Sequence, residues 1–226
     1  MGRKLERYKG LISSASPLEL ESWVRALLVH YFFHVSDKHG LEVTSDDAAQ
    51  ARRSVNLMTP TVFKGPGRIR LGATTVFGVP RSPGSYDCSY VESRTPQSLI
   101  EIGDGTVINN RAVILSEGAA VRIGRRCLIG FEVQMLDSNA HQLELGRRHL
   151  PDDRPQPIVV EDDVFIGGRA TLLKGCRIGR GSVVAAGAVV QPGFQAPPMS
   201  IVAGNPARVV GQVRAASDAV AAGGAA

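Results

Sequence analysis

The chain has 226 residues and a formal net charge of +5, with 43% hydrophobic, 5% aromatic and 21% charged residues. This length and composition allow a sizeable core, which excludes wholesale disorder and favours one domain. Lys and Arg are dispersed in ones and twos without interleaved aromatics, which argues against a nucleic-acid-binding protein. The 25 Gly and 13 Pro, the few aromatics and the many β-branched residues favour short strands punctuated by turns.

The cysteines and the apolar stretches indicate the cellular compartment of the protein. Cys88, Cys127 and Cys176 lack metal-ligand spacing, and no secretory signal opens the chain. The most apolar stretch, residues 23–33, contains charged Arg25 and has about half the length of a membrane span. We therefore expect a cytoplasmic protein without a membrane span.

Residues 1–67 are predicted to form an N-terminal helical segment. Ser16 and Glu19 have capping-box spacing around Pro17, and apolar residues including Trp23 then recur at helical intervals. A second short helix is predicted over residues 46–56. Three histidines also fall here, and without a carboxylate-rich motif we interpret them as surface or interface residues: His30, His34 and His39.

From about residue 68 the chain repeats internally. Aliphatic residues recur at an unbroken interval of six: Val160, Ile166, Leu172, Ile178, Val184 and Val190. The same register runs through Ile102, Ile108 and Ile114, and resumes at Ile123 after a three-residue excursion. Six residues advance an α-helix by about 600°, so this interval is not a helical stripe. It fits a short strand plus a turn, and three such units would close a triangular coil whose neighbours pair in parallel.

The hexad run and its closing segment, Ile201-Val202-Ala203-Gly204-Asn205-Pro206-Ala207-Arg208-Val209, resemble the hexapeptide-repeat acyltransferases. This superfamily includes galactoside, maltose and capsular-polysaccharide O-acetyltransferases. The resemblance covers residues 68–213 and implies a mainly β fold, a left-handed parallel β-helix of hexapeptide repeats. The handedness comes from the resemblance alone, because the general crossover rule would predict right-handed connections. We expect residues 214–226 to form a flexible Ala/Gly-rich tail.

An insertion at residues 136–157 interrupts the repeat and contains Asp137 and His141. Long excursions from a rigid scaffold often carry function. The resemblance implies that His141 is the general base, because an imidazole with a pKa near 6.5 can accept the proton of an attacking hydroxyl. Asp137 either orients this ring or shapes the turn, and His149 is interpreted as a solvated loop residue.

Asn110 coincides with an acceptor-contacting Asn of the sugar acetyltransferases. Its neighbour Asn109 leaves the assignment open, and a hexad turn would itself favour Asn, which tolerates left-handed backbone geometry.

The resemblance also implies acetyl-CoA as co-substrate, lying between subunits of a homotrimer. Gly168 matches the residue whose backbone N–H meets the thioester oxygen, and Phe165 stands where relatives often carry Trp. Ala186 and Gly187 match small residues that let the pantetheine arm approach, although a tight coil also requires small residues.

Relatives often have Thr-Lys after this coil, and this chain has Gln191-Pro192, so its contacts to the CoA phosphates must differ. Arg208 is the first candidate for that charge, with Arg180 and Arg214 as alternatives.

Tyr86, Tyr90 and Glu92 precede the first full coil in a stretch like that of capsule and lipopolysaccharide acetyltransferases. They are candidates to line a sugar pocket, and strand packing explains them equally well.

These features predict an acetyl-CoA-dependent O-acetyltransferase of a sugar or polysaccharide precursor, with no metal. N-acetylation of a nucleotide-linked amino sugar is the main alternative. A zinc enzyme of the γ-carbonic-anhydrase type needs three convergent imidazoles, and the repeat region has only His141 and His149. A non-catalytic β-helix scaffold is the remaining alternative. The sequence leaves the acceptor, the acetylated position and the acyl length open.

Overall fold

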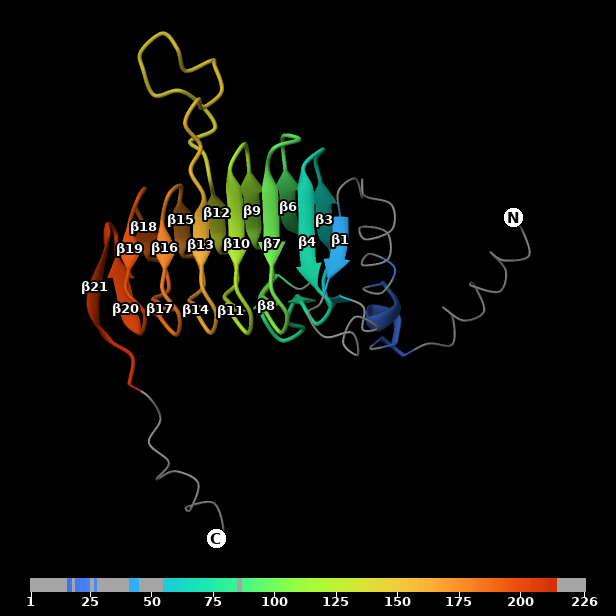
Figure 1. Ribbon diagram of the computed structural model, residues 1–226. Coiled ribbons are helices and arrows are strands. Elements are labelled where there is room, and N and C mark those ends of the chain that lie inside the picture. Colours follow the sequence, from blue (N-terminus) through green and yellow to red (C-terminus); the bar gives the residue numbers. More distant parts are fainter. Residues whose placement is uncertain are drawn as a thin grey trace.

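The computed structural model describes residues 16–17, 19–24, 27, 41–44, 55–84 and 87–214. Their strands wind around one axis and stack into three sheets, which form the three faces of a prism (Figure 1).

The sheets are named A, B and C. Sheet A contains β1 (Leu41–Thr44), β4 (Arg68–Gly72), β7 (Leu99–Ile102), β10 (Ala120–Ile123), β13 (Ile158–Val160), β16 (Arg177–Ile178) and β19 (Gln195–Ala196). Sheet B contains β2 (Asn56–Leu57), β5 (Val76–Phe77), β8 (Val107–Ile108), β11 (Leu128–Ile129), β14 (Phe165–Ile166), β17 (Val183–Val184), β20 (Ser200–Gly204) and β21 (Ala207–Gln212). Sheet C contains β3 (Thr61–Lys64), β6 (Ser89–Ser93), β9 (Val113–Ser116), β12 (Gln134–Leu136), β15 (Thr171–Leu173) and β18 (Val189–Val190).

The pairing confirms the predicted triangular coil. Along the closing coils, paired residues lie 18 positions apart, as in Val160 with Ile178 and Phe165 with Val183, and the strands are parallel. Between β7 and β10 the separation is 21, which is the predicted three-residue excursion. The last pair, β20 with β21, is antiparallel, so the chain turns back and covers the end of sheet B.

The hexad residues fill the interior of the prism. Five of the six aliphatic positions that define the repeat are completely buried, and the sixth, Val160, is 1% exposed. Cys127 and Cys176 are also buried, and burial raises the pKa of the Cys176 thiol to about 12. They therefore act as small apolar residues, as predicted.

The turns share one backbone conformation. A left-handed residue recurs at every sixth position through the closing coils: Asp163, Arg169, Gly175, Gly181, Gly187, Gly193 and Met199. Glycine adopts this conformation without the cost of about 1–2 kcal/mol that other residues meet, which explains much of the glycine excess. In the turn after β8 the left-handed residue is Arg111, so Asn110 does not serve that purpose.

The N-terminal segment is only partly helical where it is described. Pro17 lies in a helix, and the capping box is confirmed: the Ser16 amide donates to Glu19 Oε2 at 2.8 Å, and the Glu19 amide donates to Ser16 Oγ at 3.3 Å. Trp23 lies on this helix and is 43% exposed.

Strands β1, β2 and β3 lie inside the predicted helical segment of residues 1–67, so the sheets begin before residue 68. The earlier start escapes the hexad pattern because β3 pairs with β6 at a separation of 28 residues, which hides the interval of six. Asn56, the last residue of the predicted second helix, belongs to β2. Residues 46–54 and the three N-terminal histidines lie outside the described residues. Within the described part of the chain, no helix has the length and apolarity needed to cross a membrane.

Replacing a left-handed glycine by alanine should destabilise the coil. The Cβ of Gly193→Ala would meet no atom within 4 Å, and φ is +73°, so backbone strain is the only cost. We expect urea denaturation to show a loss of about 1–2 kcal/mol. Gly211→Ala is the control, because Gly211 is outside this region and its nearest neighbour would be an Ile201 carbon at 3.6 Å. Equal effects of the two substitutions would contradict the account of the turns.

Candidate active site

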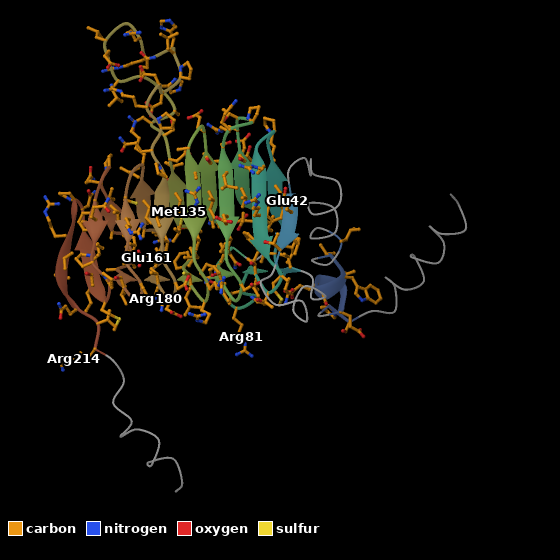
Figure 2. The ribbon with its side chains drawn as sticks, viewed as in Figure 1. Glu42, Arg81, Met135, Glu161, Arg180 and Arg214 are labelled. Atoms are coloured by element: carbon orange, nitrogen blue, oxygen red, sulfur yellow. The ribbon has the colours of Figure 1, made fainter. Side chains whose placement is uncertain are left out.

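The insertion predicted from the broken repeat is the long loop of residues 137–157. It leaves the prism after β12 and returns at β13, at the edge where sheet C passes into sheet A, and it extends away from the coils (Figure 1). Figure 2 shows the side chains of the far part of this loop standing away from the prism.

His141 lies on the outgoing arm of this loop and is exposed. It forms an antiparallel bridge with Pro151 of the returning arm, and the Gln142 amide donates to the Leu150 carbonyl at 3.1 Å. Ala140, immediately before it, has a left-handed φ of 63°, and its amide donates to Ser138 Oγ at 2.9 Å. Such strain persists only where surrounding contacts impose it, as they often do at functional sites. The imidazole is thus presented to solvent from a backbone of defined shape.

Asp137 faces the previous coil. Its buried carboxylate accepts hydrogen bonds from Ser116 Oγ at 2.7 Å, the Glu117 amide at 2.7 Å and the Ala119 amide at 3.0 Å. Burial raises the pKa of this carboxyl, and the same hydrogen bonds oppose the rise. These contacts support the turn-shaping role for Asp137.

Asp152 organises the returning arm. The carboxylate accepts from Lys174 Nζ at 2.6 Å and from the amides of Asn139 at 2.8 Å and Arg154 at 3.1 Å. Burial acts to raise the pKa of Asp152, but these donors outweigh it and lower the pKa to about 2. The residue pattern did not single out this carboxylate, because Lys174 is 22 positions away and belongs to the next coil.

The Asp152 carboxylate should titrate with a midpoint of about 2 by carboxyl-carbon NMR. Because its folded pKa lies below the ordinary value of about 3.9, its contribution to stability is complete above that value and is lost as the pH falls toward 2. The order of the loop should therefore decline over this window. A midpoint at the ordinary value would contradict the contacts described here.

Asn110 is buried, and its side chain is committed to the chain itself. Oδ1 accepts from the Val79 amide at 2.9 Å, and Nδ2 donates to the carbonyls of Val79, Ser82 and Pro83 at 3.0 to 3.1 Å. Asn110 therefore holds the segment between β5 and β6. Asn109 is half-buried, and its Oδ1 accepts from the backbone amide of Asn110 at 2.7 Å. The side chain of Asn109 is therefore more accessible than the buried side chain of Asn110.

Gly168 lies at the edge between sheets B and C. The strand register places it between Phe131 of the preceding coil and Ala186 of the next. A Cβ at Gly168 would lie 2.7 Å from the Phe131 ring, so only glycine fits beside this ring without movement. The Gly168 carbonyl accepts from the Gly187 amide at 2.9 Å, whereas within the described residues its own amide has no acceptor. Ala186 and Gly187 are exposed, which leaves the same edge open.

Phe165 is 47% exposed on the outer face of sheet B. It pairs with Leu128, which is 53% exposed, and with Val183. The outer face of this sheet therefore carries an apolar stripe beside the Gly168 edge.

Arg208 lies near the far end of that edge. Arg208 pairs with Ala203, which continues β20 past Val202 toward the edge of Gly168. The residue is exposed, and one guanidinium nitrogen donates to the Ala207 carbonyl at 2.8 Å. Arg180 instead pairs with Asp162 at 3.2 Å on the edge between sheets A and B, where Figure 2 shows it beside Glu161. Arg214 follows β21, where the described chain ends (Figure 2).

Tyr90 and Glu92 lie on β6 of sheet C, and Tyr86 lies outside the described residues. Glu92 pairs with Arg94 at 2.8 Å and with Lys64 at 3.8 Å. Burial opposes its ionisation, but hydrogen bonds from Arg94 and Tyr90 lower its pKa, while burial raises the pKa of Tyr90. Both side chains therefore take part in a charged cluster within the chain. A role in a sugar pocket remains a prediction.

The candidate groups fall on two different edges of the prism. Gly168, Ala186 and Gly187 share the B–C edge, and His141 stands on the C–A edge, so one chain does not bring His141 and the Gly168 amide together. A hollow of about 260 Å³ lies on the third edge, lined by Gly103, Arg125 and other residues, away from both groups. In the described part of the chain no three His, Cys, Asp or Glu residues gather as metal ligands.

Residues 157–192 match a family model described as the hexapeptide repeat of succinyl-transferase. This coil is built of hexapeptide repeats. The predicted fold, a left-handed parallel β-helix, and the predicted resemblance are thereby confirmed.

This chain is similar to one curated protein in sequence and to two solved structures in fold, among others. A 2,3,4,5-tetrahydropyridine-2,6-dicarboxylate N-acetyltransferase of Staphylococcus aureus is 45% identical over 62 residues, which are 27% of this chain and only 25% of that protein. Among solved structures, AntD, an N-acyltransferase from Bacillus cereus, superposes with a TM-score of 0.58 and 15% identity over 78% of this chain and 86% of AntD. The polySia-specific acetyltransferase NeuO gives 0.51 and 18% over 79% and 90%. At these identities the structural likenesses show the fold.

Proposed function

We propose that this protein is an acetyl-CoA-dependent O-acetyltransferase of a sugar or polysaccharide precursor, with His141 as general base. The observation that carries the proposal is the exposed His141 on the longest loop that interrupts the hexapeptide coil within the described residues. The relatives support the class of reaction. AntD was solved with coenzyme A and an amino-sugar nucleotide, and NeuO acts on polySia.

The proposed mechanism is direct transfer. His141 takes the proton of the acceptor hydroxyl as its oxygen attacks the thioester carbonyl. The Gly168 amide donates to the oxyanion that develops, and the carbonyl then reforms as CoA thiolate leaves and is protonated. A free amide aimed at such an oxygen contributes about 10²- to 10³-fold in rate.

The two edges require a second subunit. The base and the amide of one chain are separated by the width of sheet C, whose strands of three to five residues span roughly 10–17 Å at about 3.3 Å per residue. A homotrimer with sites between subunits resolves this, because the loop of one chain then reaches the Gly168 edge of the next. The stripe of Leu128 and Phe165 supplies apolar surface for such packing.

Acetyl-CoA would lie along the B–C edge. Gly168 meets the thioester, Ala186 and Gly187 leave room for the pantetheine arm, and Arg208 at the end of the edge pairs with the phosphates. We place the reaction in the cytoplasm, in keeping with the three free thiols of Cys88, Cys127 and Cys176.

N-acetylation is the second candidate, because the Staphylococcus aureus relative and AntD both acylate nitrogen. An amine needs less help from a base than a hydroxyl, so comparing hydroxyl and amino sugars as acceptors separates the two reactions.

His141→Ala should lower kcat by about 10²- to 10⁴-fold, because the acceptor then loses its base. The affinity for acetyl-CoA should stay nearly unchanged, because His141 acts on the acceptor hydroxyl, whereas Ala186, Gly187 and Arg208 would hold the pantetheine arm and the phosphates. Steady-state kinetics and calorimetric titration with CoA measure the two effects. His149→Ala is the matched control, an exposed histidine on the same loop, and should retain activity. Near-normal turnover of His141→Ala would overturn the base assignment, and no CoA binding by the unmodified protein would favour the scaffold alternative.

Mixing two inactive variants should restore activity if the site spans subunits. His141→Ala lacks the base, and Gly168→Val blocks the amide edge. In randomly mixed trimers about one quarter of the sites combine an intact His141 with an intact Gly168, so about one quarter of the activity should return. Acetyl transfer after co-refolding measures this. Each variant refolded alone is the control, and no recovery in the mixture would place both groups in one chain.

A further inference from the structure

Lys174 and Asp152 form a largely buried ion pair at the base of the loop that carries His141. Nζ and Oδ2 are 2.6 Å apart, and the two side chains are 12% and 4% exposed. The other ion pairs of this loop, which Arg154 makes with Glu144 and Asp153, join side chains at least half exposed. Exposed pairs hold little structure in place, whereas loss of one partner of a buried pair leaves an uncompensated charge.

Asp152 acts on the arm that presents His141. Its Oδ2 accepts from the Asn139 amide at 2.8 Å and from Ser138 Oγ at 3.3 Å, and its own amide donates to the Ala140 carbonyl at 3.2 Å. One residue therefore contacts each of the three residues that immediately precede the proposed base.

Lys174 acts on the returning arm and ties it to the prism. It lies in the turn after β15, one coil beyond the strand from which the loop departs. Nζ also donates to the Arg154 carbonyl at 3.0 Å, and the neighbouring Gly175 amide donates to the Gln156 carbonyl at 3.2 Å. The Lys174 carbonyl accepts from the Gly193 amide of the following coil at 3.0 Å, so the backbone of Lys174 is held by the coil.

We propose that Lys174 and Asp152 are positioning residues that fix His141 against the neighbouring subunit's active-site edge. The inference rests on the proposed function, because turnover depends on this geometry only if His141 is the base. A loop joined to the prism by two chain segments pivots at its base, so a small movement there displaces the imidazole farther out. A misplacement of about 1 Å costs up to about 100-fold in rate.

Lys174→Met tests the proposal, because methionine keeps much of the volume and removes the charge. We expect kcat to fall about 10- to 100-fold with the KM for acetyl-CoA unchanged, and Lys174→Arg to restore most of the loss. Arg154→Met is the matched control. It removes a positive charge from the loop that Lys174 contacts, but that side chain is 74% exposed and Lys174 contacts only its backbone carbonyl, so activity should stay near that of the unmodified protein.

Amide hydrogen exchange supplies a readout that does not depend on activity. In Lys174→Met, exchange in residues 138–142 should rise at least about tenfold, while strands β13 to β18 keep their protection. Unchanged loop exchange would overturn the proposal. Faster exchange through the whole coil would also overturn it, because the pair would then hold the prism.

The exchange result also separates the two proposals. If the unmodified protein transfers no acetyl group but the loop still loosens in Lys174→Met, the proposed function fails and the anchoring of the loop stands. If Lys174→Met does not fold, Asp152→Asn serves as the second variant, with the same expected changes in kcat and loop exchange.

Discussion

The structure depends on the closure of an 18-residue coil in which every sixth residue adopts a left-handed turn. This geometry places one aliphatic side chain of each hexad on the axis and pairs each strand with the strand one coil later. Arg111, Glu132 and Arg169 occupy left-handed positions without the freedom of glycine, at about 1–2 kcal/mol each. Their side chains form a ladder in which Glu132 lies 2.8 Å from Arg111 and 2.7 Å from Arg169. These ion pairs therefore join residues whose left-handed backbone conformation is unfavourable.

A coil this regular leaves little freedom for chemistry inside it, because apolar side chains fill its interior. Polar groups that can act on a substrate therefore lie at the edges of the prism or on loops that interrupt the repeat. Gly168 is of the first kind, a half-buried residue at an edge, with Phe131 and Ala186 beside it in the adjacent coils. His141 is of the second kind, on the loop that separates β12 from β13. The two kinds lie on different edges of one chain, which is why the proposed site needs another copy.

The repeat was readable from the sequence because an interval of six has no other physical source in a chain of this composition. The same regularity fixed the place of the loop and of Gly168, once the register was known. Other features were not readable. Asn110 and Asp137 carry residue types suited to catalysis, yet their side chains hold neighbouring turns through contacts 18 to 31 positions away. Lys174 and Asp152 meet only because a loop of unpredictable path folds back over the next coil. Strands β1 and β3 were missed because they pair with β4 and β6 at separations of 28 residues, which conceal the interval of six.

The central claim is that one catalytic unit is assembled from two copies of this chain. A crystal structure with acetyl-CoA tests it most directly. We expect the thioester oxygen within about 3 Å of the Gly168 amide, with the partner subunit's His141 on the opposite side of the thioester carbon, within reach of an attacking hydroxyl. Acetyl-CoA bound away from the Gly168 edge, or bound there with no imidazole facing the thioester, would contradict the account.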